Sequence, residues 1–386
     1  MKIVVGQAVH GEDFWKREDE LLDIWDAIES GSHILISAPR RVGKTSIMHN
    51  IKENPKSNFI AIYINTESAD SEVEFWQKLF HHMLDEEFVN KLKAIAKNLW
   101  QKLKGIKLKK ITAAGVEFGD GEVLDYKEAF TRLIDDLDSD KKIIIMIDEF
   151  AQTIENIIKY EDEKNANKLL KVHRELRQDT KISSKVAFIY AGSIGLESVV
   201  AKMGSSKHIN DLNSIKVSQL HPNEAKEFIE KLCSNNQIEI ADSEIEYIIE
   251  KIEWLIPFYI QLILQECKKL YRKEKNITKE SIDRAIENSL EHRNHFESWQ
   301  DKLKKAFSNE TYLFSKEVLN LISENFTLDL NDIINISVKH KLSEDEARET
   351  LHSLVYDGYI NNNEDRKIYR FNSPILRMWW YQNVAN

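Results

Sequence analysis

The chain has 386 residues, 42% of them hydrophobic and 31% charged, so it can bury two or three hydrophobic cores and is not mainly disordered. Its 12 glycines and 5 prolines are about a third of the usual share, which favours long helices over a β-sandwich, a collagen or a flexible linker. The net charge of −10 argues against a general polyanion binder, and two cysteines, Cys233 and Cys267, are too few for a disulfide scaffold or a structural zinc site.

The amino-terminal sequence also lacks the pattern of a cleavable targeting peptide. The longest uninterrupted apolar run, Ile143–Ile147, is much shorter than the roughly 20 residues that span a bilayer. We therefore expect a cytoplasmic protein in a reducing compartment, without membrane contact.

The first 217 residues alternate apolar strands with amphipathic helices. Strands are predicted at 33–37, 58–65, 142–148 and 186–191, and helices at 17–30, 47–51, 71–84, 126–137 and 165–178. A small hairpin is predicted at 106–111 and 115–118. Because each of the four strands is apolar throughout, the pattern predicts an α/β fold with a parallel sheet covered by helices on both faces.

From residue 218 onward the pattern is almost entirely helical. Helices are predicted at 222–235, 242–252, 258–272, 278–297, 312–325, 329–339 and 343–356, followed by two strands at 359–360 and 368–371. Three helices followed by a hairpin are typical of a winged helix. We therefore predict three domains: a core at 1–217 with a Lys-rich insertion near 88–125, a helical lid at 218–297, and a winged helix at 298–386.

A phosphate-binding loop is predicted between the first strand and the helix that follows it. The sequence Ala38-Pro-Arg-Arg-Val-Gly-Lys-Thr45 matches G-x-x-x-x-G-K-[ST] except at the first position, where Ala replaces Gly. Such a loop turns backbone N–H groups toward phosphates at the positive end of a helix. The predicted nucleotide-binding residues here are Pro39, Arg40, Arg41, Val42, Gly43, Lys44, Thr45 and Ser46.

The residues of this loop have different expected roles. Gly43 lets the backbone approach the phosphates, Lys44 reaches the β- and γ-oxygens, and the Thr45 hydroxyl ligates Mg²⁺. Of the two arginines, Arg40 and Arg41, one could sense the nucleotide and the other could face solvent. The expected cofactors are therefore ATP or ADP and Mg²⁺.

A pair of carboxylates supplies the second part of the expected site. Asp148 and Glu149 directly follow the apolar run 143–147, so both should emerge at the carboxyl end of a parallel strand, where ligands of α/β proteins bind. We expect Asp148 to hold Mg²⁺ through water and Glu149 to polarise the attacking water.

Three further polar residues are candidates for sensing or stabilising the γ-phosphate. Ser193 ends the strand 186–191 and could face that phosphate, cap the following helix, or do both. Arg174 and Arg177 lie three residues apart on a predicted helix and so share a face. They could be arginine fingers acting in cis or toward a neighbouring subunit, or simply belong to a solvated helix face.

Several segments together resemble the archaeal-type ATPases of the STAND/AAA+ group, relatives of the origin-recognition initiator ATPases. Asp13–Leu21 is similar to that family's FxGRExEL segment, residues 39–45 to its PRRxGKT loop, and Asp148-Glu149-Phe150 to its DEF strand end. Ala191–Gly195 resembles its GS sensor segment, and Trp254–Gln261 its GxPxxxQ helix start. Leu354–Tyr359 and Arg370–Trp380 resemble its winged-helix ending.

The resemblance implies that Phe14, Arg17 and Pro257 lie near the adenine. It also implies an ATP hydrolase, slow or stimulated by a partner, in which the nucleotide moves the lid and the winged helix. Oligomerisation would fit such an enzyme.

Two functions remain open at this point. The first is a nucleotide-dependent switch that acts on an unidentified protein partner. The alternative is a nucleic-acid-binding initiator or loader, because Lys91–Lys110 carries eight lysines and no acidic residue, and the wing carries Arg366, Lys367 and Arg370. We favour the first, since the would-be recognition helix begins Ser343-Glu-Asp-Glu-Ala-Arg-Glu349, and carboxylates repel phosphates.

Overall fold

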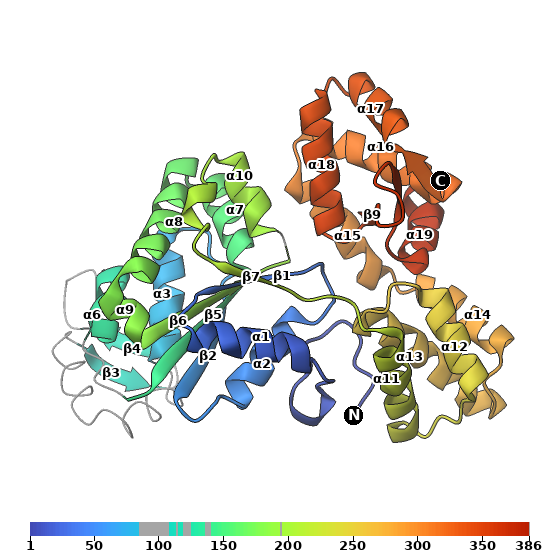
Figure 1. Ribbon diagram of the computed structural model, residues 1–386, viewed down its shortest axis with the longest axis horizontal. Coiled ribbons are helices and arrows are strands. Elements are labelled where there is room, and N and C mark those ends of the chain that lie inside the picture. Colours follow the sequence, from blue (N-terminus) through green and yellow to red (C-terminus); the bar gives the residue numbers. More distant parts are fainter. Residues whose placement is uncertain (85–107, 113–114, 119–124, 136–139, 194, 386) are drawn as a thin grey trace. The chain divides into compact units, whose positions relative to one another are not determined.

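The computed structural model describes residues 1–84, 108–112, 115–118, 125–135, 140–193 and 195–385 (Figure 1). The chain divides into two compact units. The sheet unit consists of Lys16–Ser37 and Lys44–Val217, and the helical unit of Met1–Trp15, Ala38–Gly43 and Ser218–Asn386. The boundary near residue 217 is where the sequence changes from strands to helices. However, the first fifteen residues and most of the predicted phosphate loop belong with the carboxyl-terminal helices. The division of these helices into a lid domain and a winged-helix domain stays a prediction.

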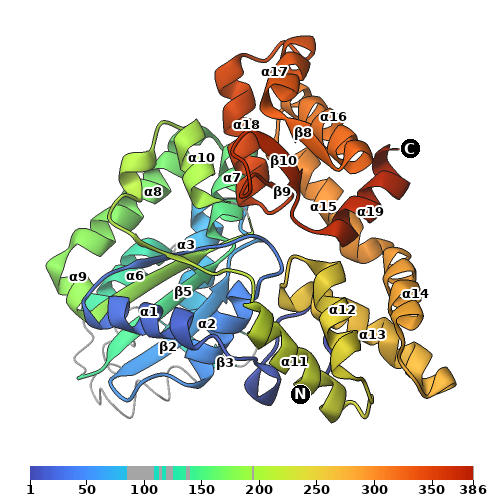
Figure 2. The same cartoon turned by 45° about the vertical axis from the view of Figure 1, so that its right-hand side comes forward.

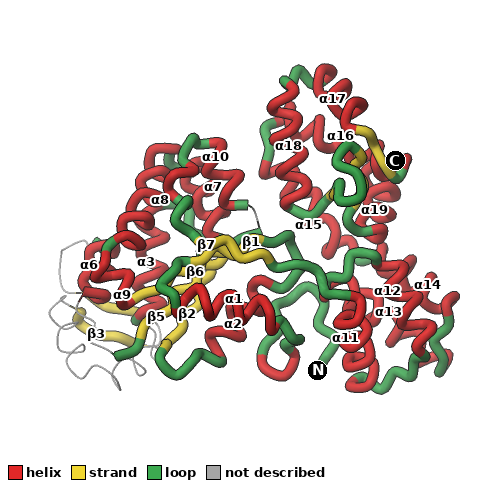
Figure 3. Tube along the Cα trace, in the orientation of Figure 1, coloured by secondary structure: helices red, strands yellow, loops and turns green. Residues whose placement is uncertain are grey.

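A five-stranded parallel sheet forms the centre of the sheet unit (Figure 3). Its strands are β1 (Ile34–Ser37), β2 (Phe59–Asn65), β5 (Lys142–Asp148), β6 (Val186–Ala191) and β7 (Asn213–Lys216), in the order β2-β5-β6-β1-β7. Every neighbouring pair is parallel. The predicted α/β class is therefore confirmed. Sequence reasoning missed β7, an edge strand of four residues with only Ile215 buried.

Helices cover both faces of this sheet, as the apolar strands require. On one side lie α1 (Glu18–Glu29) and α2 (Lys44–Glu53); on the other lie α3 (Glu72–Met83), α6 (Tyr126–Asp135), α7 (Phe150–Tyr160), α8 (Glu163–Gln178), α9 (Thr180–Lys185) and α10 (Leu196–Lys202). Ile143, Ile145 and Ile147 belong to the core on the second side, and the alternation of a strand points Ile144 and Met146 to the first. The helices α7 and α9 were not predicted.

The predicted hairpin is present as β3 (Leu108–Thr112) and β4 (Gly115–Phe118), which pair antiparallel. Most of the Lys-rich stretch, residues 91–107, lies outside the described residues. Two short 3-10 turns, Gly11–Asp13 and Ser206–His208, are the other elements among the described residues before 217.

Five helices follow in the helical unit: α11 (Pro222–Asn235), α12 (Asp242–Ile252), α13 (Pro257–Glu274), α14 (Lys279–Leu290) and α15 (Arg293–Ala306). The predicted single helix at 278–297 is wrong, because the helix is interrupted between Leu290 and Arg293. His292, at this break, has non-helical backbone angles, and its Nε2 contacts the buried Glu266 carboxylate at 2.7 Å. A tertiary contact thus ends α14 where the sequence contains neither Gly nor Pro.

The amino-terminal segment lies along these helices. The backbone N–H of Val4 donates to Oε1 of Gln261, a buried residue of α13, at 2.7 Å. The Trp15 and Phe228 rings are 5.3 Å apart, so both ends of this segment are anchored within the helical unit.

The last part of the chain combines helices with a small antiparallel sheet (Figure 2). Its elements are α16 (Asn309–Asn325), β8 (Thr327–Asp329), α17 (Leu330–Lys339), α18 (Glu344–Tyr356), β9 (Ile360–Asn361), β10 (Ile368–Phe371), α19 (Pro374–Trp380) and a π-helical turn at Tyr381–Ala385. The strands are ordered β8-β10-β9. This order suits the predicted winged helix, which stays a prediction.

Large aromatic side chains hold this part together. Trp299 of α15 and Trp379 and Trp380 of α19 are fully buried, and Phe296 stacks on Trp379 with 5.4 Å between centroids. Trp380 satisfies its indole N–H by donating to Oδ1 of Asn320 at 2.9 Å. Across the described residues, we find no helix long and apolar enough to cross a membrane.

Candidate active site

The phosphate loop connects β1 to α2 through a turn with an unusual backbone. Arg41 and Gly43 both have positive φ angles, 67° and 110°. Turns of this kind direct successive backbone N–H groups into one concavity, which suits an anion. Since α2 begins at the next residue, Lys44, the amino-terminal end of a ten-residue helix follows directly. The local backbone therefore fits a phosphate group.

The two predicted magnesium ligands lie next to each other. Thr45 Oγ1 donates a hydrogen bond to Asp148 Oδ2 at 2.8 Å, although 103 residues separate them. Burial raises the pKa of Asp148, and the neighbouring Glu149 charge raises it further, while bonds from Thr45 and Tyr63 and the charge of Lys44 act in the opposite direction. A hydroxyl and a carboxylate are oxygen ligands of the kind that Mg²⁺ prefers, so this pair fits the ion.

Sequence reasoning missed two residues that hold Asp148. The Tyr63 hydroxyl donates to Asp148 Oδ2 at 2.9 Å, and Thr66 Oγ1 donates to the Asp148 carbonyl at 3.0 Å. Tyr63 lies on β2, and Thr66 directly follows that strand. The strand β2 pairs with β5 so that Asn65 lies opposite Asp148. The sequence signal for Tyr63 was a side chain with a polar hydroxyl in a mostly apolar strand, two residues before the strand ends.

The Glu149 carboxylate is bound by Ser193. Its Oε2 accepts hydrogen bonds from the Ser193 backbone N–H at 2.9 Å and from Ser193 Oγ at 2.7 Å. Glu149 itself has a positive φ of 59°, a conformation that costs a non-glycine residue about 1–2 kcal/mol. The cap of α10 is Gly195, so the alternative that Ser193 caps this helix is wrong. The ends of β5 and β6 thus bring the two candidate residues together.

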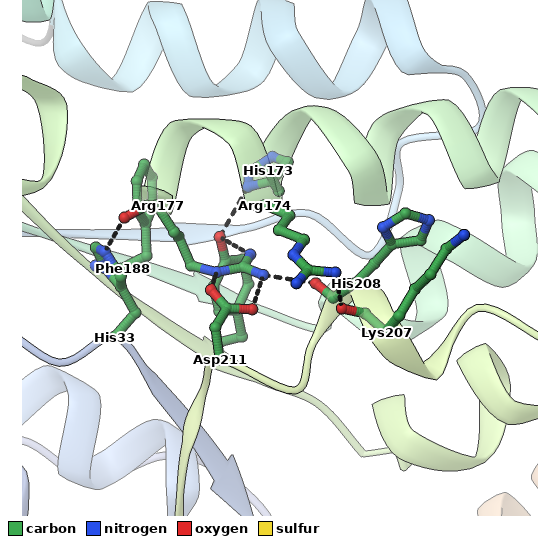
Figure 4. A network of polar contacts seen from close by, with 9 residues as sticks. His33, His173, Arg174, Arg177, Phe188, Lys207, His208 and Asp211 are labelled. Carbon is green, nitrogen blue, oxygen red and sulfur yellow. Dashed lines mark hydrogen bonds and ion pairs between the residues drawn. The ribbon is translucent and has the colours of Figure 1, made fainter. Parts of the chain in front are cut away.

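Arg177 is buried in a polar network of the sheet unit (Figure 4). Its Nε and Nη2 donate to the two Asp211 oxygens at 2.7 and 2.9 Å. Nη2 also donates to the His208 carbonyl at 2.6 Å, and Nη1 to the Tyr190 hydroxyl at 3.2 Å. Because Arg177 is buried and all three of its nitrogens are engaged, the alternative that it belongs to a solvated helix face is wrong. Its role as an arginine finger stays a prediction.

Arg174 lies one turn earlier on α8 and is only partly buried. Its Nη1 donates to the Lys207 carbonyl (Figure 4), an uncharged acceptor. The prediction that Arg174 is an arginine finger stays a prediction.

The remaining candidates divide between the two units. Arg17 is in the sheet unit and donates to Glu20 at 2.8 Å. Phe14, Pro39, Arg40, Arg41 and Val42 belong to the helical unit with Pro257, the first residue of α13. Arg40 and Arg41 are both partly buried, and each donates to a backbone carbonyl. The nucleotide-sensing role expected of one of them stays a prediction.

Comparison with known proteins identifies the family. Residues 14–253 match a family model described as an ATPase domain predominantly from Archaea. The chain belongs to this ATPase family. An ATPase domain agrees with the phosphate loop and the Asp148–Glu149 pair described above, and ATP hydrolysis is the activity that the family gives this chain.

Solved structures show that the same fold extends over the whole chain. The Walker-type ATPase PABY2304 of Pyrococcus abyssi is 16% identical, with a TM-score of 0.68, 98% of this chain and 99% of that chain covered. The ORC2 protein of Aeropyrum pernix, in ADPNP–ADP complexes, is 11% identical, with a TM-score of 0.54 and coverage of 97% and 96%. A search of curated proteins found no match.

His33 shows how closely β1 and α8 are joined in the sheet unit. The Phe188 N–H donates to His33 Nδ1 at 3.0 Å, so the proton of the neutral ring is on Nε2, which donates to the Arg177 carbonyl at 3.2 Å. Burial lowers the His33 pKa from 6.5 to about 4. His173, which contacts the Tyr190 hydroxyl through Nδ1, also has a pKa well below 6.5 because it is buried.

We expect stability to fall as the pH decreases from 6.5 toward 4. In this window the unfolded chain binds protons on His33 and His173 that the folded protein does not. Each histidine therefore removes up to about 1.4 kcal/mol of unfolding free energy per pH unit. The variant His33→Asn keeps an acceptor for the Phe188 N–H. Its unfolding free energy, measured by urea unfolding at pH 7, 6 and 5, should depend less steeply on pH, by the equivalent of about one proton. An unchanged slope would show that His33 is already protonated or exposed in the native protein.

Proposed function

We propose that this ATPase is a nucleotide-dependent switch that controls a protein partner through its lid helices and predicted winged helix. One observation carries the proposal: the phosphate loop is divided between the two units. Residues Ala38–Gly43 pack as part of the helical unit, whereas Lys44 begins α2 of the sheet unit. A nucleotide that reshapes this loop therefore acts directly on residues packed with the helical unit.

The packing around Gly358 supports this link. Gly358 forms the turn between α18 and β9 with a φ of 86°. A Cβ at this position would lie 2.8 Å from Pro39 Cβ and 2.8 Å from Trp254 Cη2. The loop, the segment before α13 and the predicted winged helix thus meet at one tightly packed point within the helical unit.

We assign the roles in hydrolysis from the phosphate loop and the ends of β5 and β6. Lys44 would bind the β- and γ-phosphates, and a magnesium ion at Thr45 and Asp148 would offset phosphate charge. Glu149 would position the attacking water, but in this structure Ser193 holds its carboxylate. Turnover would therefore be slow until the Glu149–Ser193 bonds break, which fits an enzyme stimulated by a partner.

The charges of the predicted winged helix favour a protein partner over nucleic acid. The first turn of α18 carries Glu344, Asp345 and Glu346, which would repel a phosphate backbone. In the wing, Arg370 is paired with Glu253 and Glu364, each at 3.0 Å, so its charge is offset. The loader alternative then depends on Arg366, Lys367 and the Lys-rich stretch 91–110.

Substitution of Lys44 and Glu149 should separate ATP binding from hydrolysis. Lys44→Ala should weaken ATP binding about 10- to 100-fold, since it removes a charge-assisted bond. Glu149→Gln should keep the affinity within a few-fold and slow hydrolysis about 10²- to 10⁴-fold, the usual contribution of a general base. Calorimetry and phosphate release measure the two effects. Lys52→Ala, on the last turn of the same helix, is the control and should resemble wild type. Normal turnover by Glu149→Gln would remove Glu149 from its role.

The Gly358→Ala variant tests the link between the loop and the helical unit. The added methyl must push apart Pro39 and Trp254, so we expect weaker ATP binding and faster hydrogen–deuterium exchange in α18. Gly204→Ala is a matched control, because Gly204 has a φ of 60° but a methyl added there would meet nothing within 4 Å. If both variants bind ATP as the wild type does, packing at Gly358 has no influence on the loop.

A further inference from the structure

The two arginines of the phosphate loop contact different parts of the helical unit. Arg41 Nη1 donates to the Gly6 carbonyl at 2.7 Å, and its guanidinium lies 4.9 Å from the centre of the Phe258 ring on α13. Arg40 Nη1 donates to the Ser298 carbonyl of α15 at 2.9 Å, and its guanidinium lies 5.5 Å from the Trp299 ring. Adjacent residues thus connect the loop to the first turn of α13 and to α15.

The surroundings of Arg41 hold it in one conformation. Gly6 has a φ of 79°, and a Cβ there would lie 3.2 Å from Arg41 Nη1 and 3.3 Å from His295 Cε1. The segment around Gly6 therefore packs closely between Arg41 and α15. Because Arg41 also has a positive φ of 67°, its side-chain contacts must offset backbone strain in the loop.

Arg40 reaches the predicted winged helix through Trp299. The Trp299 side chain is fully buried, and its carbonyl accepts a hydrogen bond from the Tyr359 hydroxyl at 2.6 Å. Tyr359 follows Gly358 and is itself buried. A displacement of α15 would therefore remove the carbonyl and the ring from Arg40 together.

We propose that the two arginines have separate roles. Arg41 is a positioning residue that fixes the loop for nucleotide. Arg40 couples the packing of α15 against the loop to whether the loop binds ATP. The second role rests on the proposed switch. A phosphate attracts a guanidinium more strongly than a neutral carbonyl does, so bound ATP competes with Ser298 and Trp299 for Arg40. By thermodynamic linkage, docking of α15 lowers the affinity for ATP by the same factor.

The test combines calorimetry with hydrogen–deuterium exchange on the full chain, with and without a non-hydrolysable ATP analogue and Mg²⁺. In the wild type, the analogue should increase exchange in α15. Arg40→Gln should raise exchange in α15 about tenfold without nucleotide and abolish the response to the analogue. Arg41→Gln should weaken analogue binding about tenfold, the loss expected for one charge-assisted bond, while the response of α15 at saturation remains.

Two further variants separate these roles from a general charge effect. Arg348→Gln removes a positive charge from the exposed Arg348–Glu344 pair of α18 and should match wild type in both measurements. Arg40→Lys keeps the charge but loses the planar stacking group, so its α15 should exchange at an intermediate rate.

Each outcome bears on a different part of the proposal. Wild-type exchange in Arg40→Gln would overturn the role of Arg40, and wild-type affinity in Arg41→Gln would overturn that of Arg41. If the wild type binds the analogue and α15 does not respond, the competition for Arg40 is wrong, whereas the role of Arg41 is still decided by affinity. If the wild type binds no nucleotide at all, the proposed function fails instead, and exchange in nucleotide-free Arg40→Gln alone decides whether Arg40 holds α15.

Discussion

The buried carboxylate of Asp148 is the constraint on which the candidate active site depends. Only 3% of this residue is exposed, and a buried carboxylate is costly unless it accepts hydrogen bonds. Its donors come from three places: Thr45 on α2, Tyr63 on β2 and the N–H of Glu149. Satisfying one charge therefore sets the positions of α2, β2 and the start of α7 relative to β5.

Two strained backbone positions belong to the predicted catalytic segments. Arg41 and Glu149 are non-glycine residues with positive φ angles, and each lies within or beside a predicted catalytic segment. Such conformations persist only where surrounding contacts fix them. Glu149 has its bonds with Ser193, and Arg41 has the Gly6 carbonyl and the Phe258 ring. Under the proposed switch, Glu149 would relax when its bonds with Ser193 break, whereas the contacts of Arg41 hold its strained backbone in place.

The sequence predicted what short-range patterns determine and missed what tertiary contacts determine. The strands β2, β5 and β6 are continuous apolar runs, so they and the parallel sheet were predictable. The strand β7 is short and mostly polar, and the break between α14 and α15 depends on the contact of His292 with Glu266, 26 residues away. Helical spacing placed Arg174 and Arg177 on one face, but the buried Arg177 pairs with Asp211, which no local pattern connects to it. Likewise, only the fold shows that residues 38–43 pack with the helical unit.

The chemistry of the partners of Arg40 and Arg41 explains how one loop can be held by protein and still attract phosphate. The structure provides each arginine with a carbonyl oxygen and the face of an aromatic ring. The carbonyl dipole and the ring quadrupole stabilise the guanidinium cation. Unlike a carboxylate, neither group cancels its positive charge. The loop thus keeps two positive charges in the residues that immediately precede α2 in the sequence, and the amino-terminal end of a helix itself favours anions. Neutral partners also bind guanidinium more weakly than phosphate does. Under the proposed competition, a nucleotide would therefore displace the contacts of Arg40, while those of Arg41 keep the loop in place.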